Sequence, residues 1–421
     1  MTSKKLLFST KGRKINKSKN SFTLEVTDNL SLRLIFLLWC IVIITFREVN
    51  LLMIPRLWAE EGKIFYSFAR HHSLVEIFTT TQVGYLTLFN SIVSTVQAKI
   101  FPVEAAAVVA TYFGFLVQLI PILIIVFTTH SFWVFPLSRL ICLMIIIFTP
   151  PELWLNTTNS HFIFGLITFL ILVVHSDQLS LMKKWIFRML LVLGTLTGPA
   201  SMLLTPVFFI KSYMDKTKEK FIQTLIITTC SIIQAIVIIY SLVYNNQTHR
   251  LEHHNFHLTV SNFIIDHFSL NLIILNRSGL YFLGIIIAIY FIFLTIKNWK
   301  SKDFRIFSTC FIVVAIFSTL GSLNMAGSPR YGFIPTCILM MLIAQEVFSW
   351  LNNKKKIRYI IGTVIFMSCL TLNTIYYKTR MQEVYTPDYP VWRSEVEKWR
   401  IDNKYTPRIH PKHDDAWFVN L

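Results

Sequence analysis

The sequence is poor in acidic residues, in glycine and in cysteine motifs, and each of these shortages excludes a class of protein. Asp and Glu together number 22 against 40 Lys and Arg, which gives the 421 residues a net charge of +18. The six cysteines lie singly in apolar stretches, without CxxC or Cys/His spacing, so neither a disulfide framework nor a structural zinc site is indicated. The sequence contains neither a glycine-rich nucleotide-binding loop nor a Ser/His/Asp catalytic order.

What the chain has instead is apolar length. Hydrophobic residues make up 54% of it, and the mean hydropathy is +0.55. Soluble domains seldom repeat uncharged stretches of the length that a helix needs to cross a bilayer. We therefore expect an all-α, polytopic integral membrane protein with about eleven transmembrane helices. The apolar runs lie at 31–47, 105–127, 132–149, 161–174, 186–197, 199–211, 221–244, 279–297, 305–321, 330–351 and 358–377.

The positions of the basic residues predict the topology. They fall in five clusters: the N-terminus up to Lys19, and groups around Lys183, Lys216, Lys300 and Lys355. Basic loops stay on the cytoplasmic side of a membrane, and all five clusters agree if the N-terminus is cytoplasmic and the C-terminus external. This count requires the stretch 84–100 to lie in the outer interface as an amphipathic helix without crossing. Charges that mark topology in this way also argue against a nucleic-acid partner and for the lipid bilayer.

The predicted organisation has three parts. Residues 1–30 are a basic cytoplasmic N-terminus, which together with the first apolar run is typical of a signal anchor and not of a removed signal peptide. Residues 31–377 form the transmembrane domain, with an external first loop at about 48–104, and residues 378–421 are an external tail. No internal repeat indicates an inverted-repeat transporter. We expect the protein to lie in a bacterial inner (plasma) membrane.

Two adjacent carboxylates, Glu60 and Glu61, follow the first apolar run in IPRLWAEEGKIFYSFAR. A carboxylate near hydrocarbon costs a few kcal/mol unless it is hydrated or paired, so the pair indicates a polar cavity or a cation partner. On a helix the two side chains would point about 100° apart, and at most one would face a given site. Such a carboxylate can take a proton from an attacking hydroxyl. The alternative is a solvated pair that balances Arg56 and Lys63.

Three segments resemble the GT-C superfamily of membrane glycosyltransferases, whose familiar members are protein O-mannosyltransferases and aminoarabinose transferases. WAEEG with Phe65 is similar to the acidic first-loop motif of that family. GYLTLFNSIVSTVQAKIFPVEAA is similar to its juxtamembrane helix, and LLVLGTLTGPASMLLTPVFF to its short paired helices after the fourth span. The resemblance covers about residues 30–215. It implies a catalytic carboxylate at Glu61, which occupies the position of the family's Asp. Because both residues here are Glu, the choice between Glu60 and Glu61 stays open.

The link PPELWLNTTNSHF before the fourth apolar run is the second candidate segment. Its polar residues are expected on the same face of the membrane as the acidic pair, where they can bind sugar hydroxyls or complete the acidic site. These substrate-binding candidates are Glu152, Asn156, Asn159 and His161. The alternative is that Asn159 or Ser160 only caps the following helix.

The third candidate is Arg330 with Tyr331, in GSPRYGF at the outer end of a span. An arginine can hold a phosphate through two parallel hydrogen bonds, which suits the polyprenyl phosphate that a lipid-linked sugar donor leaves behind. The alternative is an arginine that extends to lipid phosphates. Arg277 is a weaker candidate for the same role.

Two further features favour other roles. His249, His253, His254 and His257 have i, i+4 spacings that suit a metal in a helix, but loop histidines are usually only solvated. We assign no metal ligands and no certain cofactor, and leave a divalent metal as an open alternative. In the tail, Trp392, Val396 and Trp399 share a helical face. That face is expected to pack on the outer interface, with capping of the active site as the alternative.

Together these features predict a membrane glycosyltransferase of the cell envelope. The donor is a polyprenyl-phosphate-linked sugar, because nucleotide sugars are not expected on the non-cytoplasmic face. The acceptor is a glycolipid such as a lipopolysaccharide component, a polysaccharide or a protein. Two other classes remain: a flippase for polyprenyl-linked glycans, and a glycan polymerase or ligase. The last class would depend on Arg250 or His254, whereas the first function depends on the acidic pair.

Overall fold

The computed structural model describes most of the chain. The described residues are 30–47, 49–147, 150–244, 256–269, 276–321, 329–352, 364, 368, 371, 390–411 and 417–421. These residues form helices and two isolated β-bridges, without a β-strand among them. The prediction of an all-α protein is therefore confirmed over the described residues. The histidines at 249, 253 and 254 and almost all of the run 358–377 lie outside them.

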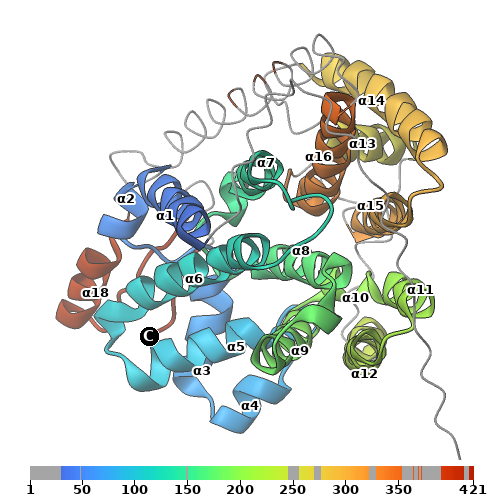
Figure 1. Cartoon of the computed structure of the whole chain (residues 1–421). Helices are drawn as coiled ribbons and strands as arrows, with labels where there is room; N and C mark the ends of the chain where they lie inside the picture. The colour runs from blue at the N-terminus through green and yellow to red at the C-terminus, as the bar shows by residue number, and fades with distance from the viewer. Residues whose placement is uncertain are drawn as a thin grey trace, which may run out of the picture.

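Ten of the eleven apolar runs coincide with helices (Figure 1). Four helices are long and apolar enough to cross a membrane: α1 (Leu30–Arg47), α6 (Ala106–Phe127, extended from Val103), α12 (Lys218–Tyr244) and α14 (Arg277–Lys297). A fifth span results if α9 (Leu181–Thr195) counts together with α10 (Pro199–Met202) and α11 (Thr205–Asp215), although the pair is bent by 116°. The apolar character is thus confirmed, and the count of eleven spans stays a prediction. The remaining bundle helices are α7 (Pro136–Ile147), α8 (Ser160–Val173), α13 (Phe256–Phe268), α15 (Lys302–Gly321) and α16 (Pro329–Asn352).

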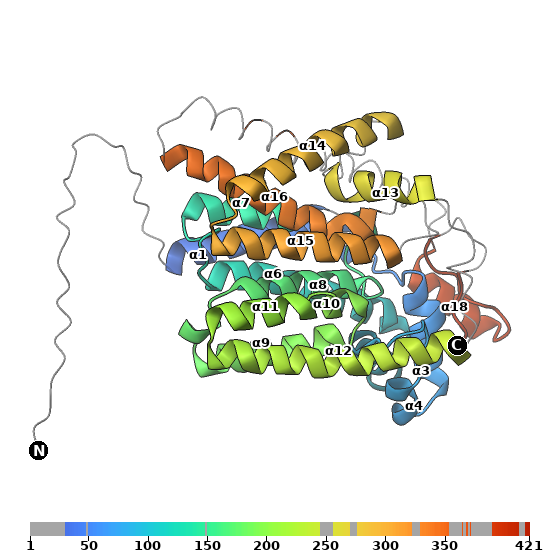
Figure 2. The ribbon, with the colours of Figure 1, turned by 90° about the vertical axis from the view of Figure 1, so that its right-hand side faces the viewer.

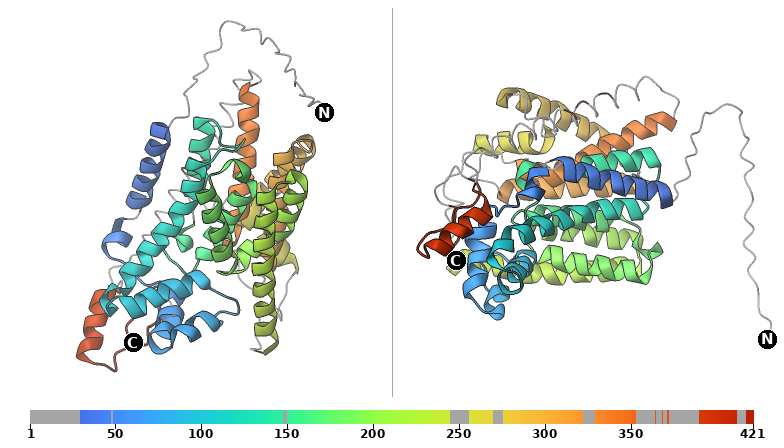
Figure 3. Two further views of the ribbon diagram at one scale, coloured as in Figure 1. Left: turned by 60° about the horizontal axis from the view of Figure 1, so that its bottom comes forward. Right: turned by 90° about the vertical axis from the view of Figure 1, so that its left-hand side faces the viewer.

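The long helices lie alongside one another, and one end of this bundle is covered by shorter segments (Figure 2). We call this covering the cap and define it as residues 49–105, 390–411 and 417–421. Its helices are α2 (Val49–Met53), η1 (Glu61–Tyr66), α3 (Ser67–His71), α4 (Leu74–Thr79), α5 (Leu88–Thr95), η2 (Val96–Ile100), η3 (Val103–Ala105) and α18 (Trp392–Ile401). Figure 3 shows from two further sides that the light-blue helices of the first loop and the red α18 lie together at this end.

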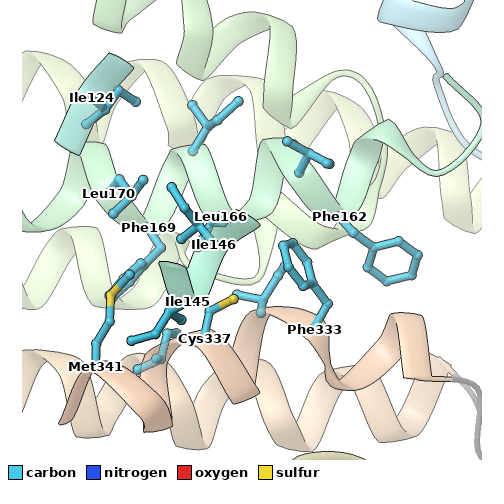
Figure 4. Packing of buried hydrophobic residues seen from close by; sticks show 14 of the residues in the cluster. Ile124, Ile145, Ile146, Phe162, Leu166, Phe169, Leu170, Phe333, Cys337 and Met341 are labelled. Carbon is cyan, nitrogen blue, oxygen red and sulfur yellow. The ribbon is translucent and has the colours of Figure 1, made fainter. Parts of the chain in front are cut away.

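Helix α8 is the centre of the core. Every one of its residues is buried except His161 at its start. It is apolar on all sides because α6, α9, α10, α15 and α16 surround it, and a helix that is hydrophobic all round is buried. Figure 4 shows Phe169 and Leu166 of α8 packed towards Cys337 and Met341 of α16. The segment that leads into α8 is therefore fixed by the best-packed helix of the molecule.

The end of the bundle opposite the cap holds a network of charges. Lys220 donates to the carbonyl oxygens of Ile171 and Leu172 at 2.9 and 2.8 Å, and so satisfies the C-terminal end of α8. Arg188 pairs with Glu219 at 2.6 Å, linking α9 to α12. Asp215 of α11 pairs with Lys302 of α15 at 2.6 Å. Three of the five basic clusters thus share one end of the bundle, in agreement with their assignment to a single side of the membrane.

The stretch 84–100 forms two short helices, α5 and η2, within the cap. Its side chains Asn90, Ser91, Ser94 and Gln97 are buried in the protein, whereas Lys99 is exposed. Asn90 donates to the carbonyl oxygen of Thr157 at 3.0 Å, and Gln97 donates to that of Ala106 at 2.8 Å. Polar groups at these positions are buried because each finds a backbone partner. The expected amphipathic pattern therefore reflects contacts with the bundle.

Gly114 of α6 sets the distance between α6 and the link before α8. A Cβ atom at this position would lie 2.6 Å from the carbonyl carbon of Leu155 and 2.8 Å from the amide nitrogen of Asn156. Both are backbone atoms, which cannot move aside as a side chain can. Leu155 itself has a positive φ of 47°, so this part of the link is already constrained.

We predict that Gly114→Ala lowers the stability of the protein by about 1–3 kcal/mol, the usual cost of overpacking. Thermal unfolding in detergent measures the effect. Gly194→Ala is the matched control, because its new Cβ atom would first meet the hydroxyl of Ser201 at 3.1 Å, and a side chain can yield. Equal melting temperatures for Gly114→Ala and the unaltered protein would show that the link is free to shift away from α6.

Candidate functional site

Glu61 is anchored inside the protein. Its exposed fraction is 2%. The oxygen Oε1 accepts hydrogen bonds from the backbone N–H and the hydroxyl of Thr157, the latter at 2.8 Å, and Oε2 accepts one from the backbone N–H of Trp58 at 2.8 Å. The carboxylate thus joins the first loop to the link that precedes α8. Buried polar groups need such partners, since an unpaired one costs several kcal/mol.

The turn that carries the acidic pair has an unusual backbone. Ala59 adopts a positive φ of 46°, a conformation that non-glycine residues rarely adopt. This kink turns the chain from Trp58 into η1 and brings the Trp58 N–H onto the carboxylate three residues ahead. The guanidinium of Arg56 lies over the Trp58 ring, 4.0 Å from its centroid, and adds a cation–π contact. Arg56 is itself buried, with 3% exposure.

Burial raises the pKa of the Glu61 carboxyl above its ordinary value, while the hydrogen bonds from Thr157 and Trp58 and the charge of Arg56 hold it down in part. The folded state therefore binds this proton more tightly than the unfolded chain does. By linkage, the contribution of Glu61 to stability is largest at acid pH. It falls as the pH rises through the ordinary carboxyl pKa towards the raised one.

Glu60 faces a cavity of about 160 Å³ next to this anchor. The walls come from the first loop, from the link before α8 together with its first residues, and from the start of α16. The lining residues are Glu60, Phe65, Val83, Tyr85, Thr87, Thr158, Asn159, His161, Phe162, Arg330 and Tyr331. Concave sites that combine aromatic walls with a few convergent polar groups are the usual binding sites of small molecules.

The cavity brings a carboxylate and a guanidinium into one space. Glu60 lies on the side of the first loop and Arg330 at the first turn of α16. The Arg330 guanidinium carbon is 5.3 Å from the centroid of the Tyr331 ring, and that ring meets Phe162 edge to face at 5.5 Å. His161, the one side chain of α8 that is not buried, completes the wall at the start of that helix. A carboxylate, a guanidinium and aromatic surfaces therefore converge.

The structure separates the predicted site residues into two groups. Five of them line the cavity together: Glu60, Asn159, His161, Arg330 and Tyr331. The other three, Glu61, Glu152 and Asn156, lie outside the lining. Asn156 donates to the backbone carbonyl of Glu152 at 2.6 Å and accepts from the N–H of Asn159, so the three residues of the link form a structural turn. The preference for Glu61 as the residue that faces substrate is not supported by this geometry.

Two neighbours of the cavity were missed from the sequence. Tyr85 lines it and meets the His161 ring edge to face at 6.1 Å. Gly198, in the bend between α9 and α10, has a φ of 151°, and a Cβ atom there would lie 2.8 Å from the His161 Cβ. The motif TGPAS carried a signal, because a Gly-Pro pair is typical of a turn. That signal does not indicate that Gly198 lies beside the cavity, and Tyr85 carried no signal of its own.

The remaining candidates lie elsewhere. Arg277 donates to the side-chain oxygen of Asn262 at 2.7 Å and is not among the lining residues. Among the described residues, no group of three or more His, Cys, Asp or Glu side chains could hold a metal ion. In the tail, Trp392 and Val396 are buried within the protein, in a cluster with Leu57 and Tyr66 of the first loop, and Trp399 packs at their edge. This face therefore packs on the first loop, whereas the sequence pattern predicts packing on the outer interface.

Comparison with known proteins identifies no relative. No protein-family model matches the chain, and no curated sequence matches it significantly. The resemblance to GT-C enzymes therefore stays a prediction from the motifs.

We predict that Glu61→Gln destabilises the protein by about 1–3 kcal/mol, because an amide NH₂ would then face the N–H of either Thr157 or Trp58. Thermal unfolding over a pH series measures it. The loss should be largest near pH 4 and shrink at higher pH, since only the unaltered carboxyl titrates. Glu60→Gln, on the half-buried cavity wall, is the matched control and should change stability by less than about 0.5 kcal/mol. Equal effects of the two variants would contradict the anchoring role.

Proposed function

We propose that this protein is an integral-membrane glycosyltransferase that moves a sugar from a polyprenyl-phosphate donor to an acceptor hydroxyl in the capped cavity. The observation that carries the proposal is the meeting of Glu60 and Arg330, from opposite parts of the sequence, in one lined space. A transfer from a lipid phosphate needs both groups, a base for the acceptor and a cation for the phosphate.

Glu60 is the general base in this proposal. Both carboxylate oxygens of Glu61 already accept hydrogen bonds, whereas Glu60 lies on the cavity wall. As the acceptor oxygen attacks C1 of the sugar, its proton passes to Glu60. The new C1–O bond forms while the bond from C1 to the phosphate oxygen breaks, and attack from the opposite face inverts the anomeric centre. Glu61 positions its neighbour by fixing the turn.

Arg330 holds the phosphate. It stands at the first turn of α16, next to the end of a bundle of apolar helices, where a polyprenyl chain can stay in the bilayer while its phosphate reaches polar groups. A guanidinium stabilises the charge that grows on the departing phosphate through two parallel hydrogen bonds. Tyr331 and Phe162 offer aromatic surface, and Asn159 and Tyr85 offer hydrogen-bonding groups for sugar hydroxyls.

The proposal includes the orientation of the chain. The cap with its cavity faces the non-cytoplasmic side, and the charged end around Arg188, Lys220 and Lys302 faces the cytoplasm, as basic residues do. About eleven spans in a bacterial inner membrane, with a cytoplasmic N-terminus and an external C-terminus, complete this picture. The acceptor is a glycolipid, a polysaccharide or a protein of the cell envelope.

We predict that Glu60→Gln lowers the rate of transfer by about 10²–10⁴-fold, the range that a general base contributes. Glu60→Asp should retain part of the activity, because the shorter side chain keeps the charge but loses reach. Purified protein and a synthetic polyprenyl-phosphate sugar provide the measurement. Transfer by Glu60→Gln at the rate of the unaltered protein would contradict the assignment of Glu60 as the general base. Loss of activity on changing Arg250 or His254 instead would favour a polymerase or ligase.

For Arg330 we predict a graded result. Arg330→Lys should keep part of the transfer activity and raise the KM for the donor. The lysine ammonium keeps the positive charge but cannot form the two parallel hydrogen bonds of a guanidinium with phosphate. Arg330→Ala should lose far more at equal protein level. The measurement is donor titration of both variants. Near-normal KM values in both would reduce Arg330 to a contact with lipid headgroups, and Arg277→Ala serves as the matched arginine control outside the cavity.

A further inference from the structure

The tail of the chain is bound directly to the turn that carries the acidic pair. The N–H of Ala59 donates to the carbonyl oxygen of His410 at 2.5 Å. The N–H of His410 in turn donates to the carbonyl oxygen of Leu57 at 3.2 Å. The ring of His410 stacks on Trp58, with 6.4 Å between centroids and 9° between planes. Resting on the proposed function, we propose that the tail is a positioning element of the site, which fixes the turn so that Glu60 stays on the cavity wall.

A shared apolar cluster supports this link. Leu57 and Tyr66 of the first loop are fully buried against Trp392, Ile409 and Val419 of the tail. The fit is close at Gly62, where a Cβ atom would lie 2.6 Å from the Ile409 side chain and 2.9 Å from that of Val419. The residue that follows the acidic pair therefore packs on the tail itself.

The tail also holds the start of α6, the far end of the same loop. The indole N–H of Trp392 donates to the carbonyl oxygen of Val103 at 2.8 Å. Arg400 pairs with Glu104 at 2.6 Å. Between these two ends, the N–H of Asn420 donates to the hydroxyl of Ser67 at 3.0 Å. One segment thus contacts the loop at its beginning, middle and end.

The tail is organised well enough to act as a fixed support. The buried carboxylate of Glu395 accepts from Lys398 at 2.7 Å, from the Tyr405 hydroxyl at 2.6 Å and from the N–H of Arg408 at 2.9 Å. These bonds tie α18 to the extended segment that reaches His410. A support of this kind is required because the positive φ of Ala59 persists only where the surroundings hold it.

The role predicts a specific kinetic signature. If the tail releases the turn, Glu60 shifts and the catalytic rate falls, since an error of about 1 Å in the position of a catalytic group can cost about 10²-fold. Donor binding stays intact, because Arg330 belongs to α16, which packs on α7, α8, α13 and α15. A tail that only stabilises the fold would lower the amount of active protein and leave the rate of each active molecule unchanged.

The experiment uses the full chain with Trp392→Leu and Ile409→Ala combined, which removes a hydrogen bond and apolar contacts of the tail without touching the cavity. Arg393→Ala is the matched control on the same helix, with its side chain 81% exposed. Release of the tail is followed separately by the rate at which maleimide labels Ser67→Cys, relative to the chain without that cysteine.

We expect the double variant to label at least about tenfold faster and its kcat to fall by about 10²-fold, with an unchanged KM for the polyprenyl-phosphate sugar. Faster labelling with an unchanged kcat would overturn the positioning role, and so would unchanged labelling. If the unaltered protein transfers no sugar, the proposed function fails by itself. The yield of a bifunctional cross-link between Glu60→Cys and Arg330→Cys then decides: a drop in the double variant supports the role, and an equal yield overturns it.

Discussion

The candidate site depends on one buried carboxylate. Glu61 accepts hydrogen bonds from the N–H and hydroxyl of Thr157 and from the N–H of Trp58, so it joins the first loop to the link before α8. Because a buried carboxylate without partners is costly, these three contacts fix the loop against the bundle. Glu60, the next residue, is thereby held at the cavity wall. The two adjacent carboxylates thus have different surroundings: Glu61 is the buried anchor and Glu60 lines the cavity.

Two rigid supports meet at this anchor. The first is α8, which is buried along its whole length except for His161. The link that leads into this helix is therefore held in a fixed position relative to the bundle. The second is the tail, whose backbone hydrogen bonds to Leu57 and Ala59 hold the kinked turn. Arg330 arrives separately on α16, which packs against α8. Glu60 and Arg330 are therefore held by different parts of the structure. For this reason the proposed base and the proposed phosphate contact can be tested independently.

The sequence predicted the architecture better than the site. Apolar runs of span length specify helices by composition alone, and ten of eleven appear as such. Arg330 and Glu60 were found from chemistry, as charges at the predicted outer surface. The division of roles between Glu60 and Glu61 was out of reach, because it depends on Thr157, far along the chain, and on the positive φ of Ala59. Long-range contacts of this kind leave no periodic signal.

The most direct test is a structure of the protein with a non-hydrolysable polyprenyl-phosphate sugar analogue bound. We expect the phosphate to lie within hydrogen-bond distance of the Arg330 guanidinium. The sugar should pack against Tyr331 and Phe162, with its C1 atom open to attack from the side of Glu60. An analogue bound with its phosphate away from this cavity, for example at Arg277, would contradict the proposal that sugar transfer takes place between Glu60 and Arg330.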